Sequence, residues 1–245
     1  MDRRSFVKRS SISGLGIALL PNLVFPHNTD PEYSILELMG KEDIKLHGKG
    51  IQLRKAAHDA FIAMKKAAYQ DGIAIKIVSS YRSFSRQESI WERKYGTYTD
   101  DGMEPIAAID KIIEYSTIPG TSRHHWGTDI DIIDGNQKTD GDVLVPSKFG
   151  TDGPFEALKK WMDENAKTYD FHLVYTDDPA RRGFKYEPWH YSYAPISVPM
   201  LATFRRKNIM ALLQEEEFYG SEIFTEGFLK NYIRDNILGI NRVLL

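Results

Sequence analysis

The chain has 245 residues, of which 42% are hydrophobic and 27% are charged, as expected for a globular protein with a hydrophobic core. This length is compatible with one large domain, or with one domain plus small additions. The formal net charge of -2 gives no indication of a nucleic-acid partner. The absence of cysteine excludes disulfides, thiolate zinc ligands and a cysteine nucleophile.

The first 30 residues have the layout of an export signal. Arg3 and Arg4 precede a mostly apolar stretch, residues 10–25, which is interrupted by glycines and by Pro21. A basic region followed by a short apolar region is typical of signal peptides, and the paired arginines favour the twin-arginine route. The apolar stretch is too short for a membrane span, so we expect a periplasmic or cell-envelope protein without a stable span once the signal is removed. An uncleaved anchor is the alternative, and the cleavage point stays open.

The rest of the chain alternates between helical and strand patterns. Apolar residues recur at helical spacing over 51–70, and Asp71-Gly72 ends that pattern. The β-branched residues of 73–79 predict a strand. By the same criteria we expect a short helix at 34–39, helices at 86–94, 106–115 and 154–169, strands near 128–133, 171–175 and 184–192, and C-terminal helices at 200–213 and 220–238. Turn-rich loops are expected at 96–103, 134–152 and 176–183.

Two histidines and two aspartates lie in the short stretch from Ser122 to Asp131. Turn residues flank it, and its second half is an apolar strand pattern. Zinc accepts nitrogen and oxygen ligands, and a catalytic zinc site has three protein ligands and one open position. His124, in the loop, and Asp131, in the strand, would supply two ligands. His125 with Asp129 or Asp131 is the alternative register.

The third ligand must come from elsewhere, and His190 is the best candidate. Glu187 lies three residues before it and is followed by Pro188, so this segment is extended. In a regular strand Glu187 and His190 would point to opposite faces, so we expect a bend near Pro188 that brings both to one site. His172, which alternates with apolar neighbours in its predicted strand, is the rival third ligand.

These residues resemble a known family. The pattern Ser-x-His-x6-Asp followed downstream by Glu-x-x-His is similar to the zinc peptidases of the lysostaphin, D-alanyl-D-alanine peptidase and sonic hedgehog superfamily, and especially to the D-alanyl-D-alanine carboxypeptidase branch. The stretch Ser79-Ser80-Tyr81-Arg82-Ser83 with Gln87 resembles another motif of the family. The match runs from about residue 53 to residue 193. Three motifs in the family's order make it specific.

The resemblance assigns roles to particular residues. It implies one zinc ion per chain, bound by His124, Asp131 and His190, with Glu187 as the catalytic base. Arg82 follows a predicted strand, and its planar guanidinium can bind a carboxylate or a polarised carbonyl through two hydrogen bonds. We therefore expect Arg82 to act on the substrate. Further substrate-binding candidates are Tyr81, Gln87 and Ser122, although Ser122 could instead hold the loop.

The expected fold is α+β: a small, mostly antiparallel sheet with flanking helices and a zinc cleft, extended by C-terminal helices. The expected divisions are a signal segment at 1–30, a zinc peptidase domain at 31–195 and a helical extension at 196–245. The resemblance implies an exported carboxypeptidase that removes terminal D-Ala from peptidoglycan stem peptides. An L,D-carboxypeptidase, a D,D-dipeptidase or a cross-link endopeptidase would share these residues. A non-catalytic zinc-binding recognition domain is the alternative from another class, which Glu187 disfavours. Oligomeric state stays open.

Overall fold

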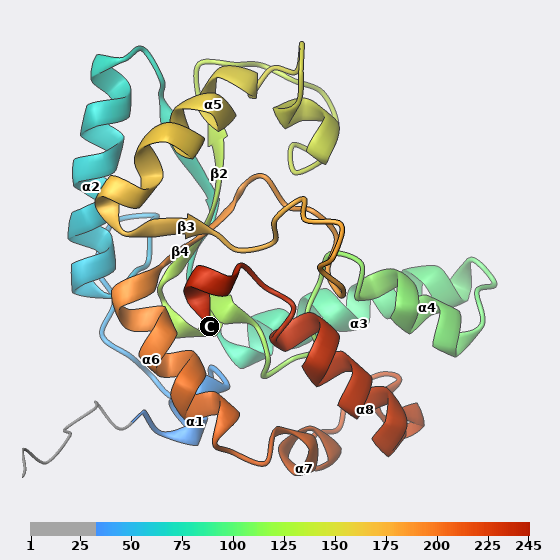
Figure 1. The fold of residues 1–245 in the computed structure, drawn as a ribbon. Coiled ribbons are helices and arrows are strands. Elements are labelled where there is room, and N and C mark those ends of the chain that lie inside the picture. The colour runs from blue at the N-terminus through green and yellow to red at the C-terminus, as the bar shows by residue number, and fades with distance from the viewer. Residues whose placement is uncertain (1–32) are drawn as a thin grey trace, which may run out of the picture. The chain divides into compact units, whose positions relative to one another are not determined.

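The computed structural model describes residues 33–245, so the expected signal segment lies outside the described residues. A four-stranded sheet has the strand order β1-β2-β4-β3, and every neighbouring pair is antiparallel (Figure 1). The strands are Ile75–Ser79 (β1), Asp129–Asp134 (β2), Phe171–Leu173 (β3) and His190–Tyr193 (β4). This sheet, together with the helices around it, confirms the expected α+β class.

One face of the sheet is covered by α2 (Lys55–Gln70) and α5 (Glu156–Asn165), which lie beside the strands in Figure 1. Ile130 and Ile132 of β2 belong to the core between these helices and the sheet. Side chains alternate along a strand, so Asp129 and Asp131 point to the other face. The hydrophobic pattern of β2 therefore determines where its carboxylates lie.

A second hydrophobic core lies among the remaining helices and extends to the C-terminus. These helices are Ile35–Leu38 (α1), Phe84–Asp100 (α3), Pro105–Ile112 (α4), Ala194–Arg205 (α6), Ile209–Gln214 (α7) and Glu226–Tyr232 (α8). Buried side chains from distant parts of the sequence meet here, such as Trp126 and Phe204, whose rings lie 6.2 Å apart. The C-terminal helices therefore pack on the domain that carries the sheet.

Six short helical turns complete the described chain. Five are 3-10 turns, at Arg123–Trp126 (η1), Pro146–Phe149 (η2), Ala166–Tyr169 (η3), Ser221–Ile223 (η4) and Arg242–Leu244 (η6), and one is a π turn at Ile233–Ile237 (η5). Within residues 33–245, none of the helices has both the length and the apolar character needed to cross a membrane.

The expected loop at 96–103 is wrong, because α3 continues to Asp100. Thr97 and Thr99 donate their hydroxyl hydrogens to the carbonyl oxygens of Arg93 and Tyr95, at 2.8 and 2.9 Å. Threonines that bond the preceding turn in this way are compatible with a helix. The run of turn-forming residue types was therefore misleading.

The expected strand at 184–192 is shortened to His190–Tyr193. Residues 187–190 form a turn in which the His190 amide donates to the Glu187 carbonyl at 3.1 Å. Pro188 has no amide hydrogen to contribute to a strand ladder, so it favours this turn. The bend that we expected near Pro188 is confirmed.

The C-terminal helices also differ from expectation in their bounds. The helix expected at 200–213 is divided between α6 and α7, and Asn208 caps α7 by accepting from the Ala211 amide at 3.2 Å. The helix expected at 220–238 is divided among η4, α8 and η5. An asparagine cap starts a new helix, which apolar periodicity alone does not reveal.

Candidate metal centre and active site

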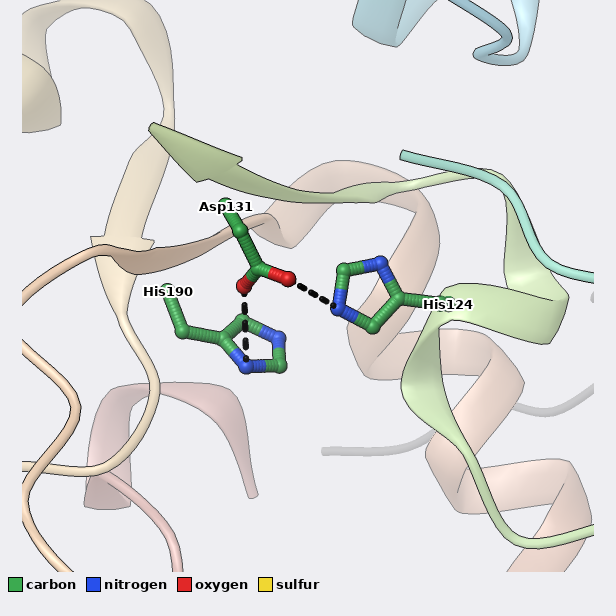
Figure 2. A group of neighbouring side chains, drawn as sticks. All are labelled: His124, Asp131 and His190. Atoms are coloured by element: carbon green, nitrogen blue, oxygen red, sulfur yellow. Dashed lines mark ion pairs between the residues drawn. The ribbon is translucent and has the colours of Figure 1, made fainter. Parts of the chain in front are cut away.

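Strand register brings Asp131 and His190 together. Asp131 of β2 lies directly opposite His190, the first residue of β4. Directly opposite residues of an antiparallel pair have side chains on the same face, a few ångströms apart. The His190 Nδ1 atom lies 3.6 Å from Asp131 Oδ1. Figure 2 shows both side chains directed toward a common point with His124.

His124 reaches this point from the η1 turn. The Ser122 hydroxyl caps the turn by accepting from the His124 amide at 3.3 Å. Gly127 ends it at φ 66°, and a Cβ there would lie 2.9 Å from Leu46. This left-handed backbone, which glycine adopts without strain, turns the chain from η1 into β2. The His124 Nδ1–H donates to the Ser80 carbonyl at 2.7 Å, which leaves Nε2 unprotonated.

The three side chains fit a metal ion. His124 Nε2 lies 3.2 Å from Asp131 Oδ2, and the ligand atoms of His124, Asp131 and His190 all lie within 4.8 Å of one another. Ligands about 2.0–2.1 Å from a tetrahedral ion are separated by roughly 3.3 Å. His124 Nε2 and Asp131 Oδ1 are buried and have no hydrogen-bond partner among the described residues. These lone pairs are desolvated and converge, which is costly unless a cation lies between them.

The carboxylate of Asp129 orients His190, the third candidate ligand. Asp129 Oδ2 lies 3.0 Å from His190 Nε2, so the opposite ring nitrogen, Nδ1, faces Asp131 and Glu187. Asp129 is completely buried, and Arg123 donates to it from Nε at 2.9 Å. Burial alone would raise the pKa of Asp129, but Arg123 and His190 hold it below its usual range. This carboxylate holds His190 in the orientation that a metal ligand requires.

The electrostatic environment of His190 favours a cation. Burial alone would lower the pKa of His190, but Asp131, Asp129 and Glu187 outweigh burial and raise it to about 10. The pKa of His124 is lowered, first by burial and then by Arg82. The carboxylates therefore attract positive charge to the His190 side of the site, while His124 stays neutral.

Glu187 lies beside the three candidate ligands but does not belong to that group. Its Oε2 lies 3.0 Å from His190 Nδ1, and only 5% of the residue is exposed. Burial raises the pKa of Glu187, the hydrogen bond to His190 opposes this change, and Asp131 adds to it. A carboxylate with a raised pKa in a partly dry site is suited to accept and release a proton.

Arg82 lies on the other side of Asp131. Its Nη2 is 3.8 Å from Asp131 Oδ2, and its Nη1 donates to Gln87 Oε1 at 2.7 Å. Gln87 is completely buried, and its amide nitrogen donates to the Thr117 carbonyl at 2.9 Å. Among the described residues, Arg82 Nε has no partner. Gln87 thus holds the guanidinium in place, and Gln87 itself does not line the cavity described below.

The site opens into a cavity of about 630 Å³, within the usual range for small-molecule sites. The candidate ligands and Glu187, Arg82, Tyr81 and Ser122 all line it, and so do the aromatic residues Tyr115, Tyr175, Phe184 and Trp189. The Ser122 hydroxyl is committed to capping η1, which supports the role of holding the loop. Tyr81 is half-buried at the wall.

The two alternative ligands, His125 and His172, do not belong to the group of convergent ligands. His125 Nδ1–H donates to the Arg82 carbonyl at 2.7 Å, and His125 Nε2 accepts from the Gly120 amide at 3.2 Å. Both ring nitrogens are therefore occupied by backbone groups, and burial lowers the pKa of His125 to about 3. His172 pairs across the sheet with Ser192 and does not belong to the group of convergent ligands.

Sequence reasoning missed Arg123, Thr128 and Ser192, which surround Asp129. The Thr128 and Ser192 hydroxyls donate to Asp129 Oδ1 at 2.8 and 2.6 Å, and Arg123 also donates from Nη2 to Ser192 Oγ at 2.7 Å. No spacing rule identifies this network, because Ser192 meets Asp129 only through the β2–β4 register.

Comparisons with known proteins identify the family of this chain. The family model VanY, described as D-alanyl-D-alanine carboxypeptidase, matches residues 50–196. A D-alanyl-D-alanine carboxypeptidase of Enterococcus faecium is 27% identical over 214 residues, which cover 82% of this chain and 60% of that protein. The chain spans about half the length of the curated relatives that it matches.

Two solved structures share the fold. VanYB in complex with D-alanine-D-alanine has a TM-score of 0.52 and 23% identity, covering 72% of this chain and 92% of that one. A mutant of the vancomycin resistance D,D-pentapeptidase VanY in complex with Zn(II) has a TM-score of 0.51 and 24% identity, covering 66% and 85%. The family match covers more than half of the chain and includes every candidate site residue. The chain therefore belongs to the VanY family of D-alanyl-D-alanine carboxypeptidases.

Proposed function

We propose that this protein is an exported zinc carboxypeptidase that removes the terminal D-Ala from peptidoglycan stem peptides ending in D-alanyl-D-alanine. The observation that carries the proposal is the convergence of His124 Nε2, Asp131 and His190 Nδ1 beside Glu187 and Arg82 in one cavity. Family membership supports the reaction class.

Zinc is the ion that best fits this donor set. Two imidazole nitrogens and one carboxylate are typical ligands of catalytic zinc, and they leave one coordination position for water or substrate. The hydrogen bonds of His124 to the Ser80 carbonyl and of His190 to Asp129 are the outer contacts that ligand histidines require. The related VanY mutant described with Zn(II) supports the same choice. We infer one ion per chain.

The bound ion would polarise the scissile carbonyl and lower the pKa of a water molecule to about 7. Glu187 would accept a proton from that water and transfer it to the amine of the departing D-Ala. Arg82 lines the cavity, its buried Nε has no partner among the described residues, and its guanidinium would hold the terminal carboxylate or the carbonyl oxygen. Gln87 would keep Arg82 in place through their 2.7 Å hydrogen bond.

The proposed substrate is supported by relatives and by location. VanYB is described in complex with D-alanine-D-alanine. Peptidoglycan lies outside the cytoplasm, so the signal layout of residues 1–30, with paired Arg3 and Arg4, agrees with a cell-wall substrate. The twin-arginine route and a periplasmic or cell-envelope location are part of the proposal.

The test is hydrolysis of a stem pentapeptide that ends in D-Ala-D-Ala, alongside the tetrapeptide that ends in a single D-Ala. We expect loss of one D-Ala from the pentapeptide, measured by mass spectrometry, and loss of activity with a chelator. Cleavage of the tetrapeptide alone would replace the proposal with an L,D-carboxypeptidase.

Glu187→Gln tests the assignment of the base. It should reduce kcat by at least about 100-fold, the usual contribution of a general base, while zinc content measured by atomic absorption stays near one per chain. Undiminished hydrolysis would refute the role of Glu187. Bound zinc with no hydrolysis of any stem peptide by the unaltered protein would instead favour a recognition domain.

A further inference from the structure

One wall of the cavity is formed by a face of α3. Arg86, Ile90 and Lys94 line it, at spacings of four residues. Residues four apart lie on one face of a helix, and four residues rise about 6 Å, so this row extends roughly 12 Å from Arg86 to Lys94. The wall therefore carries a positive charge at each end and an apolar side chain between them.

Within the described part of the chain, neither of these two cations forms an ion pair. Among residues 33–245, no carboxylate lies within 4.0 Å of the Arg86 or Lys94 charged groups, although many other surface cations are paired. Asp142 is the acidic residue of the rim on this side, and its Oδ1 already accepts from the Leu144 amide at 3.0 Å. The cavity thus has two cations beyond Arg82 that form no ion pair among the residues that the structure describes.

Lys94 is the more unusual of the two. Arg86 is exposed, whereas Lys94 is half-buried within the wall. Burial lowers the pKa of Lys94, and the neighbouring charges of Arg93 and Arg82 lower it further, although Glu187 and Asp142 act in the opposite direction. A half-buried ammonium beside two guanidinium groups is stabilised by an anion in the adjacent space.

In the proposed function, Arg82 and the candidate metal ligands bind the terminal dipeptide of the substrate. An extended peptide advances about 3.3–3.6 Å per residue, so the residue two positions before the terminal one lies about 7 Å farther along the cavity. The Arg86–Lys94 row lines the same cavity as Arg82, so it borders the space into which this residue would extend. A carboxylate on that side chain would meet a cation that has no other partner.

We propose that Arg86 and Lys94 form a second carboxylate-binding subsite, which selects stem peptides whose third residue has a side-chain carboxylate. This inference rests on the proposed function, because it assumes a peptide with its terminal carboxylate at Arg82. Lys94 supplies most of the selectivity, since its charge is less exposed to solvent than that of Arg86. Trp189 and Tyr115, with ring centroids 6.2 Å apart, supply apolar surface for the aliphatic stem.

Two pentapeptides ending in D-Ala-D-Ala make a matched test. Their third residue is meso-diaminopimelic acid in one and L-lysine in the other, which differ by one side-chain carboxylate. We expect kcat/KM to be about 10-fold higher for the diaminopimelic peptide, the usual effect of one charge-assisted hydrogen bond. A third peptide, with that carboxylate converted to its amide, should behave like the lysine peptide and so separate this carboxylate from the terminal one.

Lys94→Met removes the charge and keeps a long apolar side chain. The ratio of the two kcat/KM values should fall to about 2 or less, and the double variant Arg86→Met, Lys94→Met should bring it to about 1. Lys66→Met is the control, because Lys66 is exposed on α2 and does not line the cavity. It should keep the 10-fold ratio.

The dissociation constants of the same peptides, measured by calorimetry, separate this inference from the proposed function. A Lys94-dependent preference in binding without hydrolysis would support the subsite and refute the carboxypeptidase. Hydrolysis of both peptides at equal kcat/KM would refute the subsite and keep the carboxypeptidase. A preference that survives in the double variant would also overturn the subsite, and absence of binding by every peptide would overturn both.

Discussion

At the scale of single residues, the candidate metal centre depends on a carboxylate that is not a metal ligand. Asp129 accepts hydrogen bonds from Thr128, Ser192 and Arg123 and lies 3.0 Å from His190 Nε2. All four of these neighbours supply hydrogen or positive charge, so the carboxylate has a fixed position. His190 in turn could present only Nδ1 to a metal ion.

Asp129→Asn should therefore weaken zinc binding about 10- to 100-fold, the usual effect of changing an outer partner of a ligand histidine. An amide can place an N–H toward His190 or Arg123, where an acceptor is needed. Competition with a fluorescent zinc chelator gives the affinity. Asp134→Asn is the matched control, because Asp134 is also buried in β2 but accepts from the amides of Ala74 and Asn136. Equal weakening by both substitutions would contradict the orienting role of Asp129.

His125, which is adjacent to the candidate ligand His124, makes the stability of the fold depend on pH. Its pKa is about 3 in the folded protein because it is buried, against about 6.5 when unfolded. The unfolded chain therefore binds a proton below pH 6.5 that the folded chain does not, so His125 destabilises the fold as the pH falls from about 6.5 to 3. Between pH 7 and pH 5 this contribution amounts to about 2 kcal/mol.

His125→Gln removes this titration while its amide can still donate and accept hydrogen bonds. The variant should be less stable than the unaltered protein at pH 7, and the difference in the free energy of unfolding should shrink by about 2 kcal/mol at pH 5. Urea unfolding at the two pH values, both with chelator, gives the two differences. A difference that is constant with pH would show that His125 titrates normally in the folded state.

The residues that could be predicted from sequence are those with local spacing. His124 and Asp131 occur in one motif, and Glu187 and His190 occur in another, so their types and order were sufficient. The Asp129 network was not predictable, because Arg123, Asp129 and Ser192 meet only after β2 and β4 have paired. The family resemblance favoured His124 over the adjacent His125, and in the structure both ring nitrogens of His125 bond to backbone groups.

At the scale of elements, α8 supports the loop that leads into the candidate metal centre. The Tyr232 hydroxyl accepts from the Ile118 amide at 3.0 Å and lies 2.8 Å from the Thr121 hydroxyl. All three groups are buried. This loop ends at Ser122, which caps the η1 turn that carries His124. A C-terminal helix thus holds the backbone immediately before the first candidate ligand.

Tyr232→Phe should lower the free energy of unfolding by about 1–3 kcal/mol, because it leaves the Ile118 amide buried without a partner. Chemical denaturation measures the change. Tyr219→Phe is the matched control, since Tyr219 is 60% exposed, and its effect should stay within about 0.5 kcal/mol. If the two substitutions had the same small effect, the Tyr232 hydroxyl would not support the loop.

Elements were predicted well where periodicity was clear and poorly where side-chain contacts determine their bounds. The helix at α2 and the strands β1 and β2 lie close to their expected ranges. The length of α3 was underestimated, because Thr97 and Thr99 resemble loop residues and bond to the helix backbone only once it has formed. The short length of β4 follows from the turn at Pro188, whose presence was expected but whose extent was not.

At the scale of the whole described chain, two hydrophobic cores meet near the site. The core beside α2 and α5 determines the position of Asp131 through β2, and the second core includes Trp126, two residues after His124. The second core combines residues of α3 and α4 with residues of α6, α7 and α8. The candidate ligands His124 and Asp131 therefore depend on different cores, and their convergence requires both.

A chain that ends at Pro195 should consequently fail to fold cooperatively, although it includes all but the last residue of the family match. It would expose Trp91, Ile109, Trp126 and Phe184, which the full chain buries against C-terminal residues. Burial of each such side chain contributes about 2–3 kcal/mol, so the loss approaches the 5–15 kcal/mol by which domains are usually stable. Near-ultraviolet circular dichroism and zinc affinity would measure the outcome. The full chain with Val243→Ala is the control, because Val243 is 59% exposed and its truncation should change neither signal. A native-like spectrum and full zinc affinity in the shortened chain would instead show that the C-terminal helices only cover a domain that folds without them.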